Sequence, residues 1–187
     1  MSTPWQLRYA DKLCTAANAI GRIQPGRRIF VGSGAAEPAG LVKALVDSGA
    51  HLADNDVIHI LTLGPAPYVA PGMTDRFRHT AFFIGPNVRD AVQDGRADFM
   101  PIFLSEVPSL IRSHRVKVEV ALIQVSPPDA LGFVSLGVSV DVVLAAVQSA
   151  KLVIAQVNPH MPRTLGEDAL LPVSQLDCLI DLPEPLV

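Results

Sequence analysis

The sequence contains few cysteines, few aromatic residues and no long uncharged apolar run. The two cysteines among its 187 residues, Cys14 and Cys178, are far apart and show neither metal-binding nor redox spacing. This cysteine content favours a reducing, cytoplasmic setting. No apolar run reaches the roughly 18 residues that a membrane span needs, and residues 1–6 lack the pattern of a signal peptide. We therefore expect no membrane partner.

Metal-ligand clusters and basic clusters are scarce as well. The five histidines are not grouped with cysteines or carboxylates, so we expect no metal site. The 15 Lys and Arg residues are outnumbered by 18 Asp and Glu residues, which gives a net charge of −3. Because no run of basic residues occurs, a nucleic-acid partner is not expected.

Apolar residues, in contrast, are abundant. Hydrophobic residues make up 49% of the chain and charged residues only 18%. A chain of this length buries roughly 70% of its unfolded surface on folding. This composition indicates one domain over residues 1–187, with a sheet that is buried on both faces or a surface that packs against another domain.

Short apolar segments alternate with helical patterns along the chain, which predicts an α/β fold. The segment 116–125 holds six Val, Leu or Ile residues and is typical of a central strand covered on both faces. We expect a mostly parallel sheet with helices on both faces. Ser105 and Ser139 are the expected N-caps of two helices. Predicted strands are 29–31, 57–63, 79–84, 99–103, 116–125, 133–135, 152–157 and part of 173–180; predicted helices are 4–20, 41–49, 86–94, one from 104 and 139–150.

The segment from Arg28 to Gly40 combines a strand, a glycine turn and a helix start. Gly32 and Gly34 allow a tight turn and a close approach of the backbone to a ligand. Backbone N–H groups at the following helix start attract anions. The spacing is not a dinucleotide fingerprint, because the third glycine of GxGxxG would fall at Glu37. A purely structural turn is the alternative interpretation.

Three further loops, 65–71, 126–132 and 158–164, also follow predicted strands. In open parallel sheets, ligands bind outside the carboxyl ends of the strands. We therefore expect these loops and the glycine turn to meet at one edge of the sheet and to line one pocket, although each loop is also compatible with a simple surface role. The candidate substrate-binding residues are Gly32, Ser33, Gly34, Pro65, Tyr68, Ser126, Pro127, Asn158, Met161 and Pro162.

Five ordered segments resemble the N-terminal domain of the acetyl-CoA hydrolase/transferase family, which includes 4-hydroxybutyrate CoA-transferases. The resemblance extends from about Tyr9 to Ile180 and implies an α/β domain of the CoA-transferase type. The segments are VGSGAAEP at 31–38, LSEVP at 104–108, VALIQVSPPD at 120–129, GFVSLGVSVD at 132–141 and VIAQVNPHMPRT at 153–164.

The resemblance also implies a reaction. A glutamate would attack an acyl-CoA thioester and form a glutamyl-CoA thioester, which then passes CoA to a small carboxylate or is hydrolysed. Coenzyme A is then a substrate, and no other cofactor is implied. The family places this glutamate in a C-terminal domain, so the chain alone is expected to be inactive. No catalytic role is therefore assigned to Glu37, Glu106, Glu119, Glu167 or Glu184.

The partners implied are an acyl-CoA, a small carboxylate and the C-terminal domain of the same protein, with a homo-oligomer as a further option. Pro183-Glu184-Pro185 is interpreted as the beginning of a linker to that domain. A second function class is compatible with the same residues. In it, the chain is a non-catalytic α/β module that binds a small acyl or phosphorylated ligand, or a partner chain.

Overall fold

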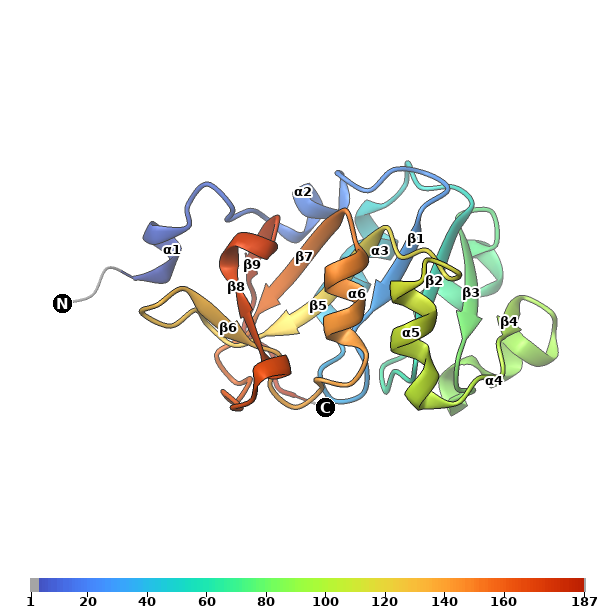
Figure 1. The fold of residues 1–187 in the computed structure, drawn as a ribbon. Coiled ribbons are helices and arrows are strands. Elements are labelled where there is room, and N and C mark those ends of the chain that lie inside the picture. The colour runs from blue at the N-terminus through green and yellow to red at the C-terminus, as the bar shows by residue number, and fades with distance from the viewer. Residues whose placement is uncertain (1–3, 187) are drawn as a thin grey trace.

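Residues 4–186 are described by a computed structural model whose centre is a seven-stranded sheet in the order β4-β3-β2-β1-β5-β7-β9 (Figure 1). Every neighbouring pair in this sheet is parallel, which confirms the predicted parallel sheet. Two further strands, β6 (Phe133–Ser135) and β8 (Leu170–Pro172), pair antiparallel beside it. The sheet strands are β1 (Arg28–Val31), β2 (Asn55–His59), β3 (Phe77–Ala81), β4 (Ala97–Phe99), β5 (Val120–Val125), β7 (Leu152–Val157) and β9 (Cys178–Asp181).

Helices cover both faces of the sheet. Helices α5 and α6 pack together on one face, and α2 and α3 pack together on the other (Figure 1). No helix within residues 4–186 is long and apolar enough to cross a bilayer. The α-helices are α1 (Trp5–Arg8), α2 (Ala16–Ile20), α3 (Ala39–Ser48), α4 (Pro86–Gln93), α5 (Val107–Arg112) and α6 (Val143–Ser149). The 3₁₀ turns are η1 (Pro67–Val69), η2 (Pro71–Met73), η3 (Leu104–Glu106), η4 (Glu167–Ala169) and η5 (Val173–Gln175).

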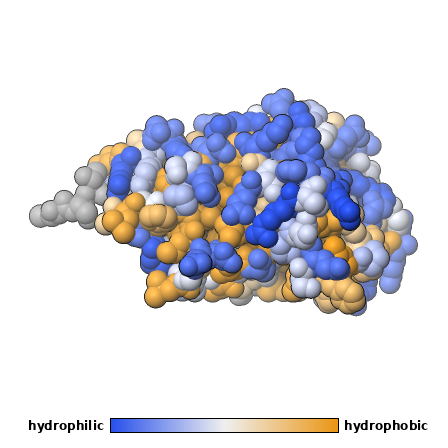
Figure 2. Space-filling view, viewed as in Figure 1, coloured by the Kyte–Doolittle hydropathy of each residue, from blue (hydrophilic) through white to orange (hydrophobic). Residues whose placement is uncertain are grey.

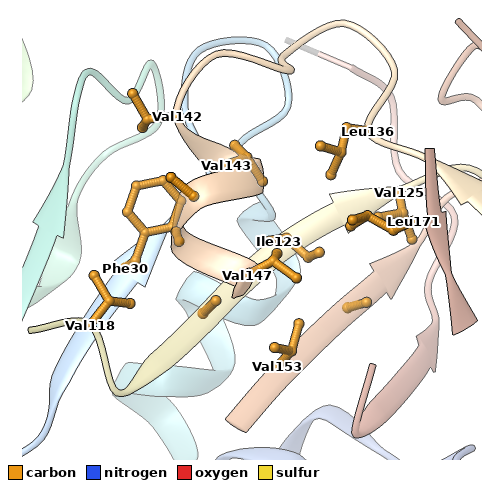
Figure 3. Close-up of a cluster of buried hydrophobic side chains, with 14 of the residues drawn as sticks. Phe30, Val118, Ile123, Val125, Leu136, Val142, Val143, Val147, Val153 and Leu171 are labelled. Carbon is orange, nitrogen blue, oxygen red and sulfur yellow. The ribbon is translucent and has the colours of Figure 1, made fainter. Parts of the chain in front are cut away.

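The core consists of two apolar layers, one on each face of the sheet. Alternate residues of a strand point to opposite faces, so β5 contributes Ile123 and Val125 to one layer and Leu122 to the other. Figure 3 shows Ile123 beside Val147 of α6 and Val125 beside Leu171 of β8. All six residues of β5 are buried, as expected for the central strand of the predicted sheet.

The predicted helix over 4–20 is wrong. Two short helices, α1 and α2, flank an extended segment that pairs with the edge strand β9. In this segment Cys14 N donates to Leu179 O at 3.1 Å, and Leu179 N donates to Lys12 O at 2.9 Å. An edge strand presents unpaired backbone groups that such a segment can satisfy. The pairing brings the Cys14 thiol within hydrogen-bonding reach of Cys178, which is distant in sequence.

Two predicted helix caps and several strand ends also differ from the structure. The carboxylate of Asp141 accepts from the backbone N–H of Val143, so Asp141 rather than Ser139 satisfies the start of α6. Glu106, not Ser105, precedes α5. β2 ends at His59, β3 covers 77–81, β4 covers 97–99, and β5 begins only at Val120. The predicted strand within 173–180 divides into η5 and β9.

Candidate functional site

The carboxyl ends of β1 and β5 form the centre of the candidate site. From β1 the chain adds β2, β3 and β4 on one side, whereas β5, β7 and β9 lie on the other. Strand order therefore reverses between β1 and β5, and such a switch point creates a crevice in which open α/β sheets bind ligands. The Gly32–Pro38 loop follows β1 at this point, and Ser126 is the first residue after β5.

The glycine turn has the geometry that its sequence suggests. Gly34 has a φ of +58°, a left-handed conformation that glycine adopts readily. Its N–H donates to Leu61 O at 2.8 Å, so the turn lies against the segment that follows β2. A Cβ on Gly32 would lie 3.2 Å from the Ala36 carbonyl, which is tighter than ordinary contact. The loop is therefore folded closely on itself and on its neighbour.

Four N–H groups of the loop are not free to bind an anion, because they donate to carbonyl groups of the protein, whereas Gly40 N at the helix start donates to the Glu184 carboxylate. Gly32 N donates to Leu122 O, and Gly34 N to Leu61 O. Ala36 N and Glu37 N donate within the turn itself, to Ser33 O and Gly34 O. These four groups stabilise the turn and do not face a ligand.

A chain of buried polar groups connects the loops at this edge, and Glu37 is its central member. Glu37 is only 2% exposed, and one oxygen of its carboxylate accepts from Leu63 N at 2.9 Å and Gly64 N at 2.7 Å. Its backbone carbonyl accepts from Gln124 Nε2 at 2.9 Å. The Gln124 side chain accepts in turn from Asn158 Nδ2. The loops after β1, β2 and β7 are thereby connected through Gln124 of β5, whereas no hydrogen bond of this network among the described residues reaches the 126–132 loop.

The chain of hydrogen bonds continues to the segment after β9. Asn158 Nδ2 also donates to Glu184 O at 2.7 Å, while the Glu184 carboxylate accepts from Gln156 Nε2 at 2.7 Å and Gly40 N at 3.1 Å. Glu184, interpreted from the sequence as part of a linker, is therefore held against the start of α3. Pairing of buried polar groups is favourable because an unpaired one is costly; within residues 4–186, Glu37 Oε1 has no hydrogen-bond partner.

A cluster of three buried polar side chains, His59, His79 and Tyr68, lies near Glu37 and the loop that follows β2. The rings of His59 and His79 stack with centroids 4.3 Å apart, and Tyr68 packs against both. Burial, reinforced by the proximity of His79, lowers the pKa of His59, and burial also lowers that of His79. Burial raises the pKa of Tyr68. These side chains are therefore neutral at physiological pH.

Several predicted site residues are internal supports. Tyr68 is 1% exposed and lies in the histidine cluster. Asn158 is fully buried, and its side chain is occupied by protein groups. The Ser126 hydroxyl accepts from Ser135 N at 2.9 Å and ties β5 to β6. Met161 is buried against Gly137, so close that a Cβ added to Gly137 would lie 2.0 Å from the Met161 sulfur.

The other predicted residues lie at or near the surface of this edge. Pro65 borders a hollow of about 430 Å³ that Glu37 and Glu184 also line. Ser33 is buried beside the glycines, and its hydroxyl has no hydrogen-bond partner among residues 4–186. Pro127 is half-buried and Pro162 is exposed. The structure thus brings Ser33 and Pro65 towards Glu37.

Sequence reasoning missed the residues that connect the loops. Gln124 and Gln156 interrupt the apolar runs VALIQV and LVIAQV one residue before each strand ends. They are direct neighbours in the register of β5 and β7. An amide in a buried strand needs a hydrogen-bond partner, so these two positions were the available signal for a polar network at this edge.

An apolar hollow of about 670 Å³ lies at the same edge, beyond β3 and β4. It is lined by the residues that follow these strands, and Phe83 and Phe103 in it are 58% and 78% exposed. Figure 2 shows hydrophobic surface along the lower edge of the view, towards which the arrows of β1, β3 and β7 point in Figure 1. Within residues 4–186, no three His, Cys, Asp or Glu side chains are arranged to hold a metal ion.

Comparison with known sequences gives a family. The profile of the acetyl-CoA hydrolase/transferase N-terminal domain matches residues 3–187. The chain is 44% identical over 183 residues to the 4-hydroxybutyrate coenzyme A transferase of Clostridium kluyveri, a match that covers 98% of this chain and 42% of that protein. It is 41% identical over 170 residues to the succinyl-CoA:acetate/propanoyl-CoA:succinate CoA transferase of Fasciola hepatica, covering 90% and 35%. The chain thus spans less than half the length of these relatives.

Solved structures agree with this result and confirm the predicted fold. RipA from Yersinia pestis superposes with a TM-score of 0.88 at 28% identity, covering 97% of this chain and 44% of that one. The 4-hydroxybutyrate CoA-transferase from Porphyromonas gingivalis superposes with a TM-score of 0.81 at 31% identity, covering 98% and 42%. The chain therefore belongs to the acetyl-CoA hydrolase/transferase family and corresponds to its N-terminal domain.

Proposed function

We propose that the chain is the N-terminal half of an enzyme that moves CoA between an acyl-CoA thioester and a small carboxylate. The observation that carries this proposal is the 44% identity over 98% of the chain to a 4-hydroxybutyrate coenzyme A transferase. The switch-point crevice between β1 and β5 supports it, because this is where an α/β sheet places a ligand. Water in place of the carboxylate would give hydrolysis.

We propose that the reaction proceeds through a glutamyl-CoA thioester and that the glutamate belongs to a C-terminal domain outside residues 1–187. Such a glutamate must reach the acyl carbon within bonding distance. Glu37 is 2% exposed and already bonded to two backbone amides, which argues against it as the nucleophile. Glu106 is exposed on the rim of the apolar hollow and lacks the environment that would activate a carboxylate.

On this proposal, the present domain supplies one wall of the crevice. The exposed apolar side chains beyond β3 and β4 are suited to pack against the C-terminal domain, since burying apolar surface drives association. Coenzyme A acts as a substrate, without a prosthetic group. A cytoplasmic location and assembly into homo-oligomers are further predictions.

A chimeric enzyme tests the proposal directly. Residues 1–187 would replace the matching segment of the Clostridium kluyveri transferase, and transfer of CoA from acetyl-CoA to 4-hydroxybutyrate would be measured beside the isolated chain. We expect turnover by the chimera and none by residues 1–187 alone. Turnover by the isolated chain that is lost in Glu37→Gln or Glu106→Gln would show that the catalytic glutamate lies in this domain.

The covalent intermediate has its own test. The chimera would be incubated with acetyl-CoA in the absence of an acceptor, and its intact mass would be measured before and after addition of hydroxylamine. We expect a CoA adduct that hydroxylamine removes, located on a glutamate outside residues 1–187. The Glu106→Gln chimera is the matched control and should form the same adduct. Absence of an adduct in a chimera that transfers CoA would contradict the glutamyl-CoA route.

A further inference from the structure

We propose that Glu37 is a positioning residue whose side-chain carboxyl group holds the 61–64 loop against the Gly32–Pro38 loop and so sets the shape of the crevice. One oxygen of this group accepts from two consecutive backbone amides, Leu63 N at 2.9 Å and Gly64 N at 2.7 Å. Without this acceptor, two amide donors would lose their partner, which is costly where water does not replace it. The catalytic part of this inference rests on the proposed function, whereas its structural part does not.

The packing around Gly64 shows that the contact is close and specific. A Cβ at this position would lie 2.6 Å from Glu37 Oε1, so any other residue would displace the carboxylate. Asn87 Nδ2 supports the loop from the other side by donating to Gly64 O at 2.7 Å and Thr62 O at 3.2 Å. The 61–64 loop is thereby clamped between two side chains, of which only Glu37 carries a charge.

Glu37 also connects this clamp to the rest of the edge. Its backbone carbonyl accepts from Gln124, which leads through Asn158 to the segment around Glu184. Only the side chain of Glu37 reaches the 61–64 loop, while its backbone serves β5 and β7. Replacement of the side chain therefore removes the bonds to Leu63 and Gly64, while the Gly34 N–Leu61 O bond and the backbone links of Glu37 stay in place.

The raised pKa of Glu37 fixes how the clamp responds to pH. Burial raises the pKa of Glu37, and the amides of Gly64 and Leu63 oppose this rise. The charged or titratable groups around it are Lys43 and Asp47 of α3 and Glu184, which line the same hollow, together with Tyr68 of η1. A loosened loop would expose the carboxyl group and return its pKa towards the ordinary value, so the clamped state binds a proton more tightly and we expect the clamp to persist as pH falls.

Amide hydrogen exchange followed by NMR on residues 1–187 measures the clamp without any assay of activity. Glu37→Ala removes the acceptor of both amides, so the protection factors of Leu63 and Gly64 should fall about tenfold at pH 7.5. Glu37→Gln keeps an oxygen acceptor and should retain most of this protection. Protection of Phe30 and Leu122 in the core should not change.

Glu184→Ala is the matched control, because Glu184 lines the same hollow but bonds to Gly40 and Gln156. It should retain the wild-type protection of Leu63 and Gly64. Unchanged protection in Glu37→Ala, or an equal loss in Glu184→Ala, would overturn the proposal. Should Glu37→Ala fail to fold, Glu37→Met, which keeps the length of the side chain but not the acceptor, decides.

The catalytic consequence is measured in the chimeric enzyme. Glu37→Ala should lower kcat about tenfold with a smaller change in KM for acetyl-CoA, and Glu37→Gln, which keeps an acceptor, should restore most of kcat. A change in exchange without any change in kcat would restrict Glu37 to a structural role. A wild-type chimera without activity would refute the proposed function and leave the exchange result intact, so the two failures are distinguishable.

Discussion

Acidification from pH 7.5 to 5.5 should destabilise the domain through the stacked pair His59 and His79. The two rings lie 4.3 Å apart on neighbouring strands and are 0% and 1% exposed. Burial lowers the pKa of both, and each proton added to His59 would also be repelled by a protonated His79. The native domain therefore holds both rings neutral at a pH at which the unfolded chain binds protons.

The sign and size of the effect follow from linkage. Histidine in an unfolded chain titrates near pH 6.5, so below this value the unfolded state binds more protons and the free energy of unfolding falls with pH. Each ring that stays neutral lowers the free energy of unfolding by about 1.4 kcal/mol between pH 7.5 and 5.5. The pair together lowers it by at most about 3 kcal/mol. For a domain of this size, that corresponds to a decrease in Tm of about 5–10 °C.

Glu37 acts in the opposite direction. Burial raises its pKa above that of the unfolded chain, so its contribution to stability is present at low pH and is lost as pH rises through the raised pKa. The overall pH dependence therefore combines both effects. The difference between the wild-type chain and a variant that lacks one histidine isolates the contribution of that ring.

Urea unfolding at pH 7.5, 6.5 and 5.5 measures this difference. His59→Gln will be less stable at every pH, but its loss of stability between pH 7.5 and 5.5 should be smaller than that of the wild type by about 1.4 kcal/mol. His160→Gln, which removes an exposed histidine, is the control and should retain the wild-type dependence. An equal loss in His59→Gln and in the wild type would refute the reasoning.

Three further predictions concern packing and reactivity. Gly137→Ala should destabilise the domain by roughly 1–3 kcal/mol in urea unfolding. The reason is that Gly137 has a φ of +65° and that the new Cβ would lie 2.0 Å from Met161 Sδ. Gly72→Ala is the control, because the space around Gly72 is open. Ile123→Ala should cost about 2–5 kcal/mol, and a loss under 1 kcal/mol would contradict its full burial. Cys14 should react about 100-fold more slowly with iodoacetamide at pH 8 than an exposed thiol, since burial and a neighbouring thiol raise its pKa to about 11. Mass spectrometry follows the reaction. A rate equal to that of an exposed thiol would argue against this environment.

The central strands were predictable from the sequence because burial on both faces leaves a continuous apolar run. The predicted strands 133–135 and 152–157 coincide with β6 and β7. The prediction for 57–63 extended beyond the end of β2, because apolar residues continue into the following loop, where Ile60 and Leu61 are half-buried and Leu63 is exposed. Apolar character reports burial, whereas the end of a strand is decided by backbone pairing.

The N-terminal segment could not be predicted in the same way. Its helical spacing is real but weak, and the unpaired edge of β9 competes for the backbone of Lys12–Cys14. Such pairing depends on a strand more than 160 residues away, with the bridge joining Leu13 to Leu179. Local propensity contains no information about a partner that only the tertiary fold supplies. The neighbouring positions of Cys14 and Cys178 have the same origin.

The candidate site divides along a similar line. Its place at the carboxyl edge followed from the parallel sheet, since all strands of such a sheet end on one side. The roles of individual residues did not follow, because a polar residue in a loop has the same sequence signature whether it faces a ligand or supports a neighbouring loop. Tyr68 and Asn158 are supports, and Glu37, for which no role was assigned, joins two loops.

Directional hydrogen bonds explain why this edge contains amides where apolar residues would fit. Gln124 and Gln156 occupy buried positions in strands that are otherwise apolar, and a pair of leucines there would bury more apolar surface. Apolar contacts constrain how close two loops lie but hardly constrain their orientation, whereas each hydrogen bond fixes both. A crevice formed by loops from four strands needs defined orientations, and the network of Glu37, Gln124 and Asn158 provides them. It follows that loss of one network member should change the geometry of the crevice more than it changes the stability of the sheet beneath it.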